Sequence, residues 1–411
     1  MINISSKAQH YIDLENKYGA HNYHPLSVVL NKGRGAKVWD VDGKEYFDFL
    51  SSYSAVNQGH CHPRILNALK EQVDKICLTS RAFYNDCLGE MEQFFHETFG
   101  YDKMLPMNTG AEAVETALKL ARRWGYRVKN IPENESYIVV CGGNFHGRTI
   151  TIVSISTDPD SYSDYGPFTP GFIKIPYNDA EALEQVIQEK GKYIAAFLAE
   201  PIQGEAGVVV PDEGYLKKCY QLCHDNNILF IADEIQTGIA RTGKMLACDH
   251  EGVRPDIVCL GKAISGGVLP ISAVLADDEI MLTIKPGEHG STFGGFPPAC
   301  RVAIEALRVV KDENMAEHAE EMGRIFREEL IKINSPFIEI VRGKGLLNAI
   351  VIKKHKEDVT AWDICEQFAT NGLLAKPTHG HIIRLAPPLC ITKEELLEAV
   401  AIIAKSLSEL A

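Results

Sequence analysis

The sequence contains no long uninterrupted run of apolar residues. Its apolar stretches, such as 138–140 and 193–199, are far shorter than the roughly 20 residues that a bilayer-spanning helix requires. The first ten residues have neither the apolar core of a secretory signal nor the arginine-rich pattern of an organellar presequence. We therefore expect no membrane association and a cytoplasmic location, unless an organellar presequence has been removed.

Basic residues are scarce relative to acidic ones. The chain has 42 lysines and arginines against 55 aspartates and glutamates, which gives a formal net charge of −13. A general nucleic-acid-binding protein would carry basic stripes, so nucleic acid is not an expected partner.

The Gly-x-Gly-x-x-Gly fingerprint of dinucleotide-binding folds is also missing after the first strand of any expected βαβ unit, which disfavours a nicotinamide-dependent oxidoreductase.

The 11 cysteines show no disulfide-framework spacing. Their number is odd and they are scattered, as in a cytosolic protein with reduced thiols. Two clusters, His60-Cys61-His62 and Cys219 with Cys223 and His224, contain possible metal ligands, but neither fits a standard zinc pattern. We predict no metal site.

Short apolar runs alternate with helical patterns through the middle of the 411-residue chain. This alternation predicts an α/β fold with a mostly parallel central sheet flanked by helices. The expected strands are 104–107, 137–141, 195–200, 229–233, 257–260 and 271–275, and the expected helices between them include 112–126 and 215–226. Beyond about residue 300, helices 299–312 and 315–333 precede strands near 338–341, 345–352 and 382–385, which indicates a smaller α+β domain. We predict an N-terminal segment (1–50) that packs with the small domain, a large domain (51–298) and the small domain (299–411).

A strand that ends in a carboxylate precedes a lysine set among glycines. The run 228–232 ends in Asp233, and Lys262 stands 29 residues later within Leu-Gly-Lys-Ala-Ile-Ser-Gly-Gly. Pyridoxal phosphate requires an amine to bond its aldehyde carbon and an anion to keep its ring nitrogen protonated. A lone lysine is usually a solvated surface charge, and a lone aspartate is often a helix cap, but apolar and glycine neighbours disfavour those interpretations here. The pair predicts a pyridoxal-phosphate site.

Other segments suit anionic groups. Gly110 follows a short strand and opens a helix whose free N–H groups favour a phosphate, although Thr-Gly before a helix is more often a simple cap. The glycine-rich loop 289–295 also suits phosphate oxygens, unless it is an ordinary flexible loop. Arg148 could grip a carboxylate bidentately or be an exposed turn residue. Arg384, inside an apolar run, would need an anionic partner if buried.

Together these motifs resemble the fold-type I, class III pyridoxal-phosphate aminotransferases, and in particular their ornithine δ-aminotransferase branch. The resemblance extends over nearly the whole chain. The segments that carry it are Tyr-Gly-Ala-His-Asn-Tyr-His-Pro (18–25), Ser-Ser-Tyr-Ser-Ala-Val-Asn-Gln-Gly-His-Cys-His-Pro (51–63), Glu-Pro-Ile-Gln-Gly-Glu-Ala-Gly-Val (200–208), Ala-Asp-Glu-Ile-Gln-Thr-Gly (232–238), Lys-Pro-Gly-Glu-His-Gly-Ser-Thr (285–292) and Arg-Gly-Lys-Gly-Leu-Leu-Asn-Ala (342–349). The stretches around Tyr53 and around Ser291 are specific to the ornithine branch.

The resemblance implies a set of cofactor-binding residues. Lys262 would bond the cofactor and Asp233 would pair with its ring nitrogen. The remaining contacts would be Gln236 at the phenolic oxygen, Phe145 stacked on the ring beside His146, and the backbone N–H groups of Gly110 and Ala111 at the phosphate. Ser291 and Thr292 would reach the phosphate of the second subunit, so the resemblance implies a homodimer with shared active sites.

It also implies how substrates are held. Tyr23 and Arg148 would hold the α-amino and α-carboxylate groups of ornithine, with Tyr53 lining the same pocket. Glu205 would neutralise Arg384 when ornithine is bound and release it when glutamate is bound. Arg384 would then take the α-carboxylate while Arg148 takes the side-chain carboxylate.

These expectations define a ping-pong transaminase. L-Ornithine would give up its δ-amine and leave glutamate 5-semialdehyde, which cyclises to pyrroline-5-carboxylate, and 2-oxoglutarate would then become glutamate. Two alternatives stay open: a sibling ω-aminotransferase acting on acetylornithine or 4-aminobutyrate, and an inactive binding protein of the same fold. One departure from the family pattern, Phe293-Gly294-Gly295-Phe296-Pro297-Pro298 in place of Tyr-Gly-Gly-Asn-Pro, predicts weaker cofactor retention or altered dimer contacts.

Overall fold

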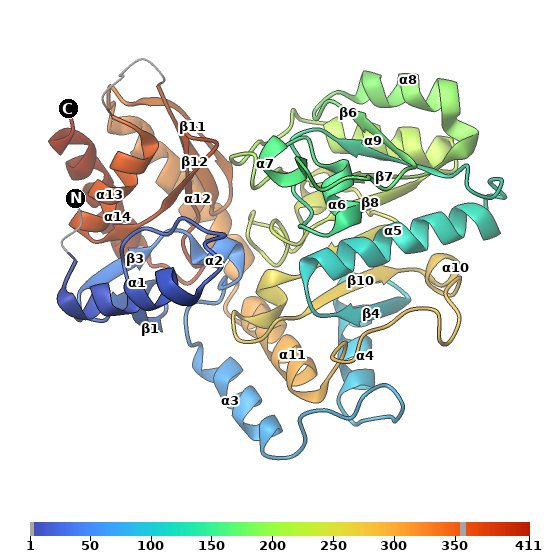
Figure 1. The fold of residues 1–411 in the computed structure, drawn as a ribbon, viewed down its shortest axis with the longest axis horizontal. Coiled ribbons are helices and arrows are strands. Elements are labelled where there is room, and N and C mark those ends of the chain that lie inside the picture. The colour runs from blue at the N-terminus through green and yellow to red at the C-terminus, as the bar shows by residue number, and fades with distance from the viewer. Residues whose placement is uncertain (1–3, 354–358) are drawn as a thin grey trace.

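The computed structural model describes residues 4–353 and 359–411. The chain forms a larger body around a seven-stranded sheet and a smaller body that contains both termini (Figure 1). The first three residues of the predicted N-terminal segment lie outside the described residues.

The central sheet has the strand order β4-β10-β9-β8-β7-β5-β6, with β10 antiparallel to both its neighbours and the pairings from β9 to β6 all parallel. Its strands are β4 (Lys103–Met107), β5 (Tyr137–Cys141), β6 (Phe172–Ile175), β7 (Ile194–Ala199), β8 (Leu229–Asp233), β9 (Ile257–Leu260) and β10 (Ser272–Ala276). The mostly parallel sheet is therefore confirmed, and each of the six expected strands is displaced by no more than one residue at either end. The edge strand β6 was missed because it is short, partly exposed and interrupted by Lys174.

Helices cover both faces of this sheet. Alternate residues of β5 point to opposite sides, so Ile138 packs in the core under α5 (Gly110–Arg127) while Val139 packs under α8 (Ala180–Lys190) and α9 (Tyr215–Asp225). The other helical segments of this body are α3 (Pro63–Val73), α4 (Leu88–Phe99), α6 (Ile150–Ile155), α7 (Pro159–Tyr162), α10 (Asp278–Met281), α11 (Pro297–Asp312) and the 3-10 turns η1 (Gly191–Tyr193), η2 (Ala247–Glu251) and η3 (Lys262–Ser265). The short segment α2 (Ser51–Ser54) lies where the two bodies meet, in contact with η3 and with Ala386.

The smaller body contains two four-stranded sheets, ordered β1-β2-β3-β13 and β11-β12-β15-β14. Its strands are β1 (Leu30–Arg34), β2 (Lys37–Asp40), β3 (Glu45–Asp48), β11 (Ile338–Lys344), β12 (Leu347–Ile352), β13 (Leu373–Leu374), β14 (Lys376–Thr378) and β15 (Ile382–Leu385). Its helices are α1 (Ser6–Tyr18), α12 (Met315–Lys332), α13 (Ala361–Asn371) and α14 (Lys393–Glu409). The parallel pairing of β3 with β13 joins residues before 50 to residues after 370 in one sheet.

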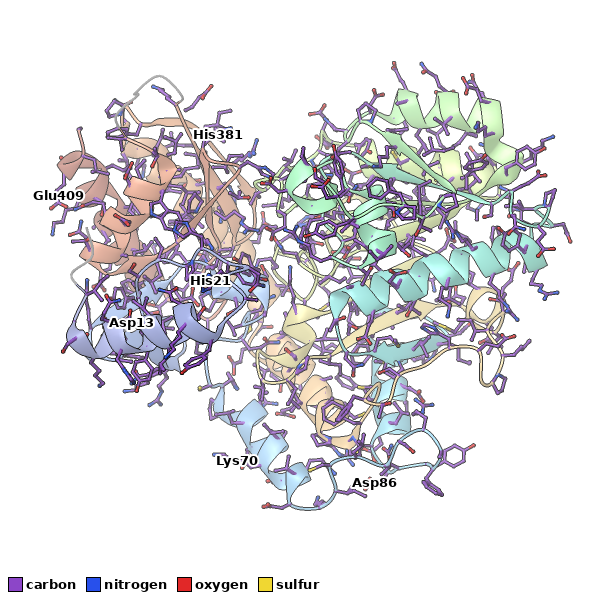
Figure 2. The ribbon with its side chains drawn as sticks, viewed as in Figure 1. Asp13, His21, Lys70, Asp86, His381 and Glu409 are labelled. Atoms are coloured by element: carbon purple, nitrogen blue, oxygen red, sulfur yellow. The ribbon has the colours of Figure 1, made fainter. Side chains whose placement is uncertain are left out.

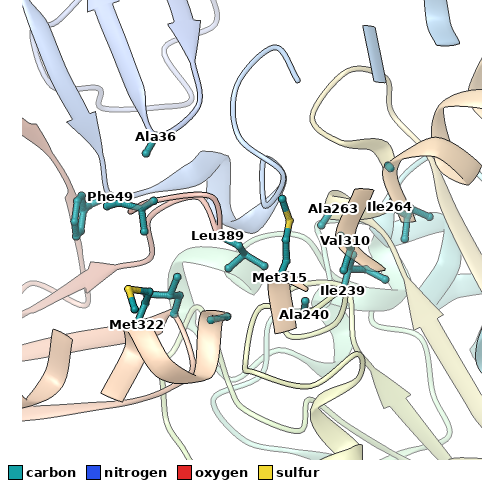
Figure 3. Packing of buried hydrophobic residues seen from close by; sticks show 14 of the residues in the cluster. Ala36, Phe49, Ile239, Ala240, Ala263, Ile264, Val310, Met315, Met322 and Leu389 are labelled. Atoms are coloured by element: carbon teal, nitrogen blue, oxygen red, sulfur yellow. The ribbon is translucent and has the colours of Figure 1, made fainter. Parts of the chain in front are cut away.

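One hydrophobic cluster runs from one body into the other. It includes Ile239 and Ala263 of the larger body together with Met322 and Leu389 of the smaller one (Figure 3). Charged side chains such as Lys70, on α3, lie instead at the periphery (Figure 2). No helix among the described residues is long and apolar enough to cross a membrane.

The helix α11 begins at Pro297 and packs against α3, α4 and η3 of the larger body. Burial of its long apolar face against these elements keeps residues 299–312 with the large body. We therefore propose a domain boundary near Glu313 rather than after 298.

Arg241 connects the two bodies from within the core. Its side chain is completely buried, and it donates hydrogen bonds to Asn57 Oδ1 (2.6 Å) and to the carbonyl oxygens of Leu346 (3.0 Å) and Pro387 (2.6 Å). Burial lowers the pKa of the guanidinium to about 9. The Arg241 guanidinium thus supplies hydrogen bonds to three buried oxygen acceptors on separate segments of the chain.

Arg241→Met should lower the free energy of unfolding by about 2–4 kcal/mol, because it leaves buried acceptors without donors. Urea unfolding of the purified variant measures this loss. Arg324→Met, which removes only the exposed Arg324–Glu328 pair, should change the value by less than about 0.5 kcal/mol. Equal effects of the two substitutions would contradict the assigned role of Arg241.

Candidate active site

Asp233 ends β8 at the carboxyl edge of the parallel strands, where α/β folds place their sites. It is 4% exposed, and its Oδ2 lies 2.6 Å from Nδ1 of His146 while Oδ1 accepts the N–H of Ile235 at 3.1 Å. His146 is buried too, and its Nε2 has no hydrogen-bond partner among the described residues. Because a carboxylate only accepts hydrogen bonds, Nδ1 of His146 is the donor, which fixes the orientation of the Asp233 carboxylate.

Lys262 opens η3 and is separated by Gly261 alone from β9, which is the neighbour of β8 in the sheet. Its φ of 44° is left-handed, a strained conformation for a non-glycine residue and one that occurs often at functional sites. Burial lowers the pKa of its amine, and Arg384 adds to this effect while Glu205 opposes it. A lowered pKa increases the fraction of Lys262 that is a neutral, nucleophilic amine.

Lys262 and Asp233 face one cavity of about 190 Å³. The cavity is lined by Gly110, Ala111, Phe145, His146, Gly147, Glu200, Asp233, Ile235, Gln236, Thr237 and Lys262. Seven of the predicted cofactor-binding residues therefore lie together. A larger hollow of about 580 Å³ lies between loop 243–245 and α12, but it has mixed charges and none of the predicted residues.

The phosphate-binding prediction rests on the start of α5. Thr109 and Glu112 form a capping box, in which Glu112 accepts the backbone N–H groups of Asn108 and Thr109. The N–H groups of Gly110 and Ala111 have no acceptor within the described chain, as is usual for the first turn of a helix. These two groups and the positive end of the helix dipole suit an anion at the cavity wall.

Ser291 and Thr292 are the two predicted cofactor residues that do not line this cavity. Ser291 Oγ instead accepts a hydrogen bond of 2.6 Å from Asn108 Nδ2, in the segment just before α5. Nearby, the rings of Phe293 and Phe296 pack edge to face with centroids 5.4 Å apart. The contribution of this loop to a second subunit stays a prediction.

Two arginines lie beside the cavity. Arg148 stands over the Phe145 ring at 5.4 Å and donates to Ser161 Oγ at 2.9 Å. Arg384, on β15, is 5% exposed and forms an ion pair with Glu205 at 2.5 Å. Burial opposes ionisation of Glu205, but the guanidinium more than compensates and lowers the pKa of that carboxyl. The site thus has two cations nearby: Arg384, which is paired with Glu205, and Arg148, for which the described residues supply no acidic partner.

Tyr53 and Gln236 adjoin the ion pair. The Arg384 guanidinium lies 4.9 Å from the centre of the Tyr53 ring, and Gln236 Nε2 donates to Glu205 Oε1 at 3.3 Å. Tyr23 lies on the segment between α1 and β1 and is 74% exposed. Burial raises the pKa of Tyr53, and the charge of Tyr23 adds to this rise.

Tyr53 belongs to a left-handed turn. All four residues of α2, Ser51–Ser54, have positive φ angles of 49°, 47°, 59° and 71°, and none is glycine. This conformation costs roughly 1–2 kcal/mol per residue relative to the right-handed one. The turn therefore persists only because surrounding contacts determine it.

Glu200 was given no role from the sequence, although it lines the cavity. It follows β7 as Asp233 ends β8, and its two carboxyl oxygens accept the N–H groups of Phe145 (2.9 Å) and Gly204 (3.2 Å). Burial raises the pKa of Glu200 to about 7. The repeated pattern of an apolar strand followed by an acid was the signal that could have identified it.

The geometry matches a known family. The model of the class-III aminotransferases matches residues 18–407, and the chain belongs to that family. The family's fold is fold-type I, in agreement with the mostly parallel sheet and smaller sheet domain. Its members use pyridoxal phosphate.

Within the class-III family, the chain is similar to ornithine and acetylornithine aminotransferases. The chain is 61% identical to the mitochondrial ornithine aminotransferase of Rattus norvegicus, over 97% of this chain and 90% of the relative. A solved structure of the ornithine aminotransferase from Toxoplasma gondii, with partial occupancy of PLP at its active site, superposes with a TM-score of 0.96 at 49% identity, over 98% of this chain and 94% of the other. The acetylornithine aminotransferase from Elizabethkingia anophelis has a TM-score of 0.90 at 58% identity, over 98% and 99% of the two chains.

Proposed function

We propose that this enzyme transfers the δ-amino group of L-ornithine to 2-oxoglutarate. The products are glutamate 5-semialdehyde, which cyclises to pyrroline-5-carboxylate, and glutamate, so the reaction links ornithine and arginine breakdown with proline or glutamate supply. One observation supports this substrate pair best: Arg384 is neutralised by Glu205 while Arg148 has no acidic partner among the described residues. Such a site accepts a substrate with one carboxylate, and it accepts one with two after the ion pair opens.

The cavity fits pyridoxal phosphate. The buried Asp233 carboxylate, fixed by His146, suits a protonated ring nitrogen, and the flat ring of Phe145 suits stacking. Gly110 and Ala111 would hold the phosphate and Gln236 the phenolic oxygen. When bound, this cofactor supplies an aldehyde that takes up amines and a ring that accepts electrons.

Lys262 is the proposed base. Its Nζ would hold the cofactor in the resting enzyme. The same amine would remove a proton from the δ-carbon of ornithine and would return one at the α-carbon of the product glutamate. Its lowered pKa keeps part of the amine unprotonated, as a base at neutral pH requires.

Tyr23, Tyr53 and Arg148 orient the substrate. Arg148 takes the α-carboxylate of ornithine, which places the α-amine near the two tyrosines and the distal δ-amine toward Lys262. Glu205 meanwhile keeps Arg384 from binding the carboxylate in the reverse orientation. This arrangement favours reaction at the δ-amine over the α-amine.

Comparison of kcat/KM for three amine donors tests the proposal. L-Ornithine should exceed acetylornithine and 4-aminobutyrate by at least tenfold, since only ornithine offers both a free α-amine and an α-carboxylate. The likeness to the acetylornithine aminotransferase of Elizabethkingia anophelis supports a second candidate. A higher kcat/KM for acetylornithine would assign that activity instead.

Arg384→Ala should affect the two half-reactions unequally. The rate with glutamate should fall about a hundredfold, because a buried carboxylate contact is lost, whereas the rate with ornithine should fall less than tenfold. Single-turnover rates with each amine donor measure this. Arg148→Ala is the comparison, since it should impair both half-reactions, and full glutamate turnover by Arg384→Ala would contradict the exchange of ion-pair partners.

We further propose a homodimer in which Ser291 and Thr292 of the partner subunit complete the phosphate site. The absence of both residues from their own chain's cavity supports this arrangement.

A cytoplasmic location stays a prediction from the N-terminal residues, and the rat relative is mitochondrial.

A further inference from the structure

The left-handed turn Ser51–Ser54 has a specific support at its start. Asp48, at the end of β3, is 7% exposed, and its Oδ1 accepts the backbone N–H groups of Leu50 and Ser51, both at 2.9 Å. These two bonds fix the chain where it enters the strained conformation. The turn thus depends on a residue outside the cavity.

His60 holds the second oxygen of this carboxylate. Its Nε2 donates to Asp48 Oδ2 at 2.7 Å, and its own backbone pairs with Gly35 through two hydrogen bonds of 2.9 and 3.0 Å. A side chain at Gly33 would collide with the ring, at 2.8 Å from Cγ of His60. The β1–β2 hairpin therefore fixes His60, and His60 fixes the Asp48 carboxylate.

The start of the turn is also joined to Ala386, the residue that follows the strand carrying Arg384. Ser51 Oγ donates to the carbonyl oxygen of Ala386 at 2.7 Å, and Ala386 N donates to the carbonyl of Phe49 at 2.8 Å. Tyr53, inside the turn, lies against the Arg384 guanidinium. A change in the turn would consequently move both the ring and the arginine that it faces.

We propose that Asp48, supported by His60, is a positioning residue for substrate binding, because it clamps the left-handed turn that places Tyr53 against Arg384. It touches neither the cavity nor the proposed substrate. The functional part of this inference rests on the proposed roles of Tyr53 and Arg384, whereas the conformational part does not.

Asp48→Ala should raise KM for ornithine about tenfold and leave kcat within about twofold, because the substrate pocket is displaced while Lys262 and Asp233 are untouched. Asp40→Ala is the matched control. Asp40 likewise accepts two backbone N–H groups on Oδ1, from Asp42 and Lys44, and one side-chain donor on Oδ2, but it serves the β2–β3 hairpin. A wild-type KM in Asp48→Ala, or an equal rise in Asp40→Ala, would overturn the proposal.

Ser52→Gly provides a rescue. Ser52 is exposed and its side chain makes no hydrogen bond with the described residues, and glycine adopts its φ of 47° without steric cost. Added to Asp48→Ala, it should lower KM again by about threefold, since it lowers the strain that Asp48 no longer restrains. A merely structural loss elsewhere would not respond to this substitution, and an unchanged KM in the double variant would contradict the clamp.

Because loss of Asp48 also lowers stability, His60→Ala gives a milder test, with an expected rise in KM of about threefold. A wild-type KM in His60→Ala counts against the clamp.

A crystal structure of Asp48→Ala, or of His60→Ala if the former does not fold, separates the clamp from the proposed function. Right-handed φ angles at 51–54 would support the clamp whichever amine proves to be the substrate, and retained left-handed angles would overturn it.

Discussion

Replacement of Lys262 by alanine should lower kcat for transamination at least a thousandfold. The side chain would supply both the amine that bonds the cofactor and the base that removes a proton from the donor carbon and delivers one to the carbon that is aminated. Loss of a positioned base alone typically costs 10²–10⁴ in rate. Steady-state assays with ornithine and 2-oxoglutarate measure the loss. The visible spectrum of the variant should also lack the absorbance of cofactor bonded to the protein.

Lys129→Met is the matched control for this experiment. Lys129 is another lysine whose pKa burial lowers, to about 8, and its amine donates to the carbonyl oxygens of Gly191 and Ile194 far from the cavity. Its replacement should reduce stability and leave kcat unchanged. A Lys262→Ala variant that retains more than about a tenth of the activity would show that another group is the base.

Asp233→Asn should lower kcat by roughly 10²–10³, which is the usual effect of removing one preorganised electrostatic contact. An amide cannot hold a proton on the cofactor's ring nitrogen, and its NH₂ group would face the Nδ1–H of His146, which is 2.6 Å away in the enzyme. Cofactor affinity, measured by equilibrium dialysis, should fall as well. The two measurements thus report the effect of Asp233 on cofactor binding as well as on the rate of transamination.

Asp256→Asn is the control for this substitution. Asp256 is also buried enough that its pKa is raised, and it accepts the N–H of Phe230 at 2.7 Å, at the opposite end of β8 from Asp233. We expect unchanged kcat in that variant. Equal kcat for Asp233→Asn and the wild type would eliminate Asp233 as the partner of the ring nitrogen.

The central sheet and the cofactor cavity could be predicted from the sequence because their signals are local. Buried strands such as β8 are continuous apolar runs, and a strand such as this one ends in the very residue that the chemistry uses. Lys262 likewise comes just after a continuous apolar run, the strand β9. Parallel topology then brings the two residues together, since carboxyl ends of parallel strands share one edge.

Other features depend on contacts between distant segments, which no local pattern encodes. Sequence propensity does not predict a left-handed turn in Ser-Ser-Tyr-Ser, because contacts outside the turn, among them those of Asp48, His60 and Ala386, help to stabilise that conformation. The N-terminal sheet was likewise missed, since its strands are short and one of its pairings, β3 with β13, joins residues more than 300 positions apart. The pattern of an apolar strand followed by an acid marks Glu200 and Asp233 separately, whereas the pairing of β7 with β8 brings the two residues to one cavity.

Addition of L-ornithine alone to the cofactor-loaded enzyme, without any oxo acid, tests the central claim most directly. The account predicts that the visible absorbance of the protein-bonded cofactor disappears, that one equivalent of glutamate 5-semialdehyde is released per site, and that 2-oxoglutarate restores the original spectrum. A spectrum that ignores ornithine but responds to acetylornithine or 4-aminobutyrate would contradict the proposed substrate.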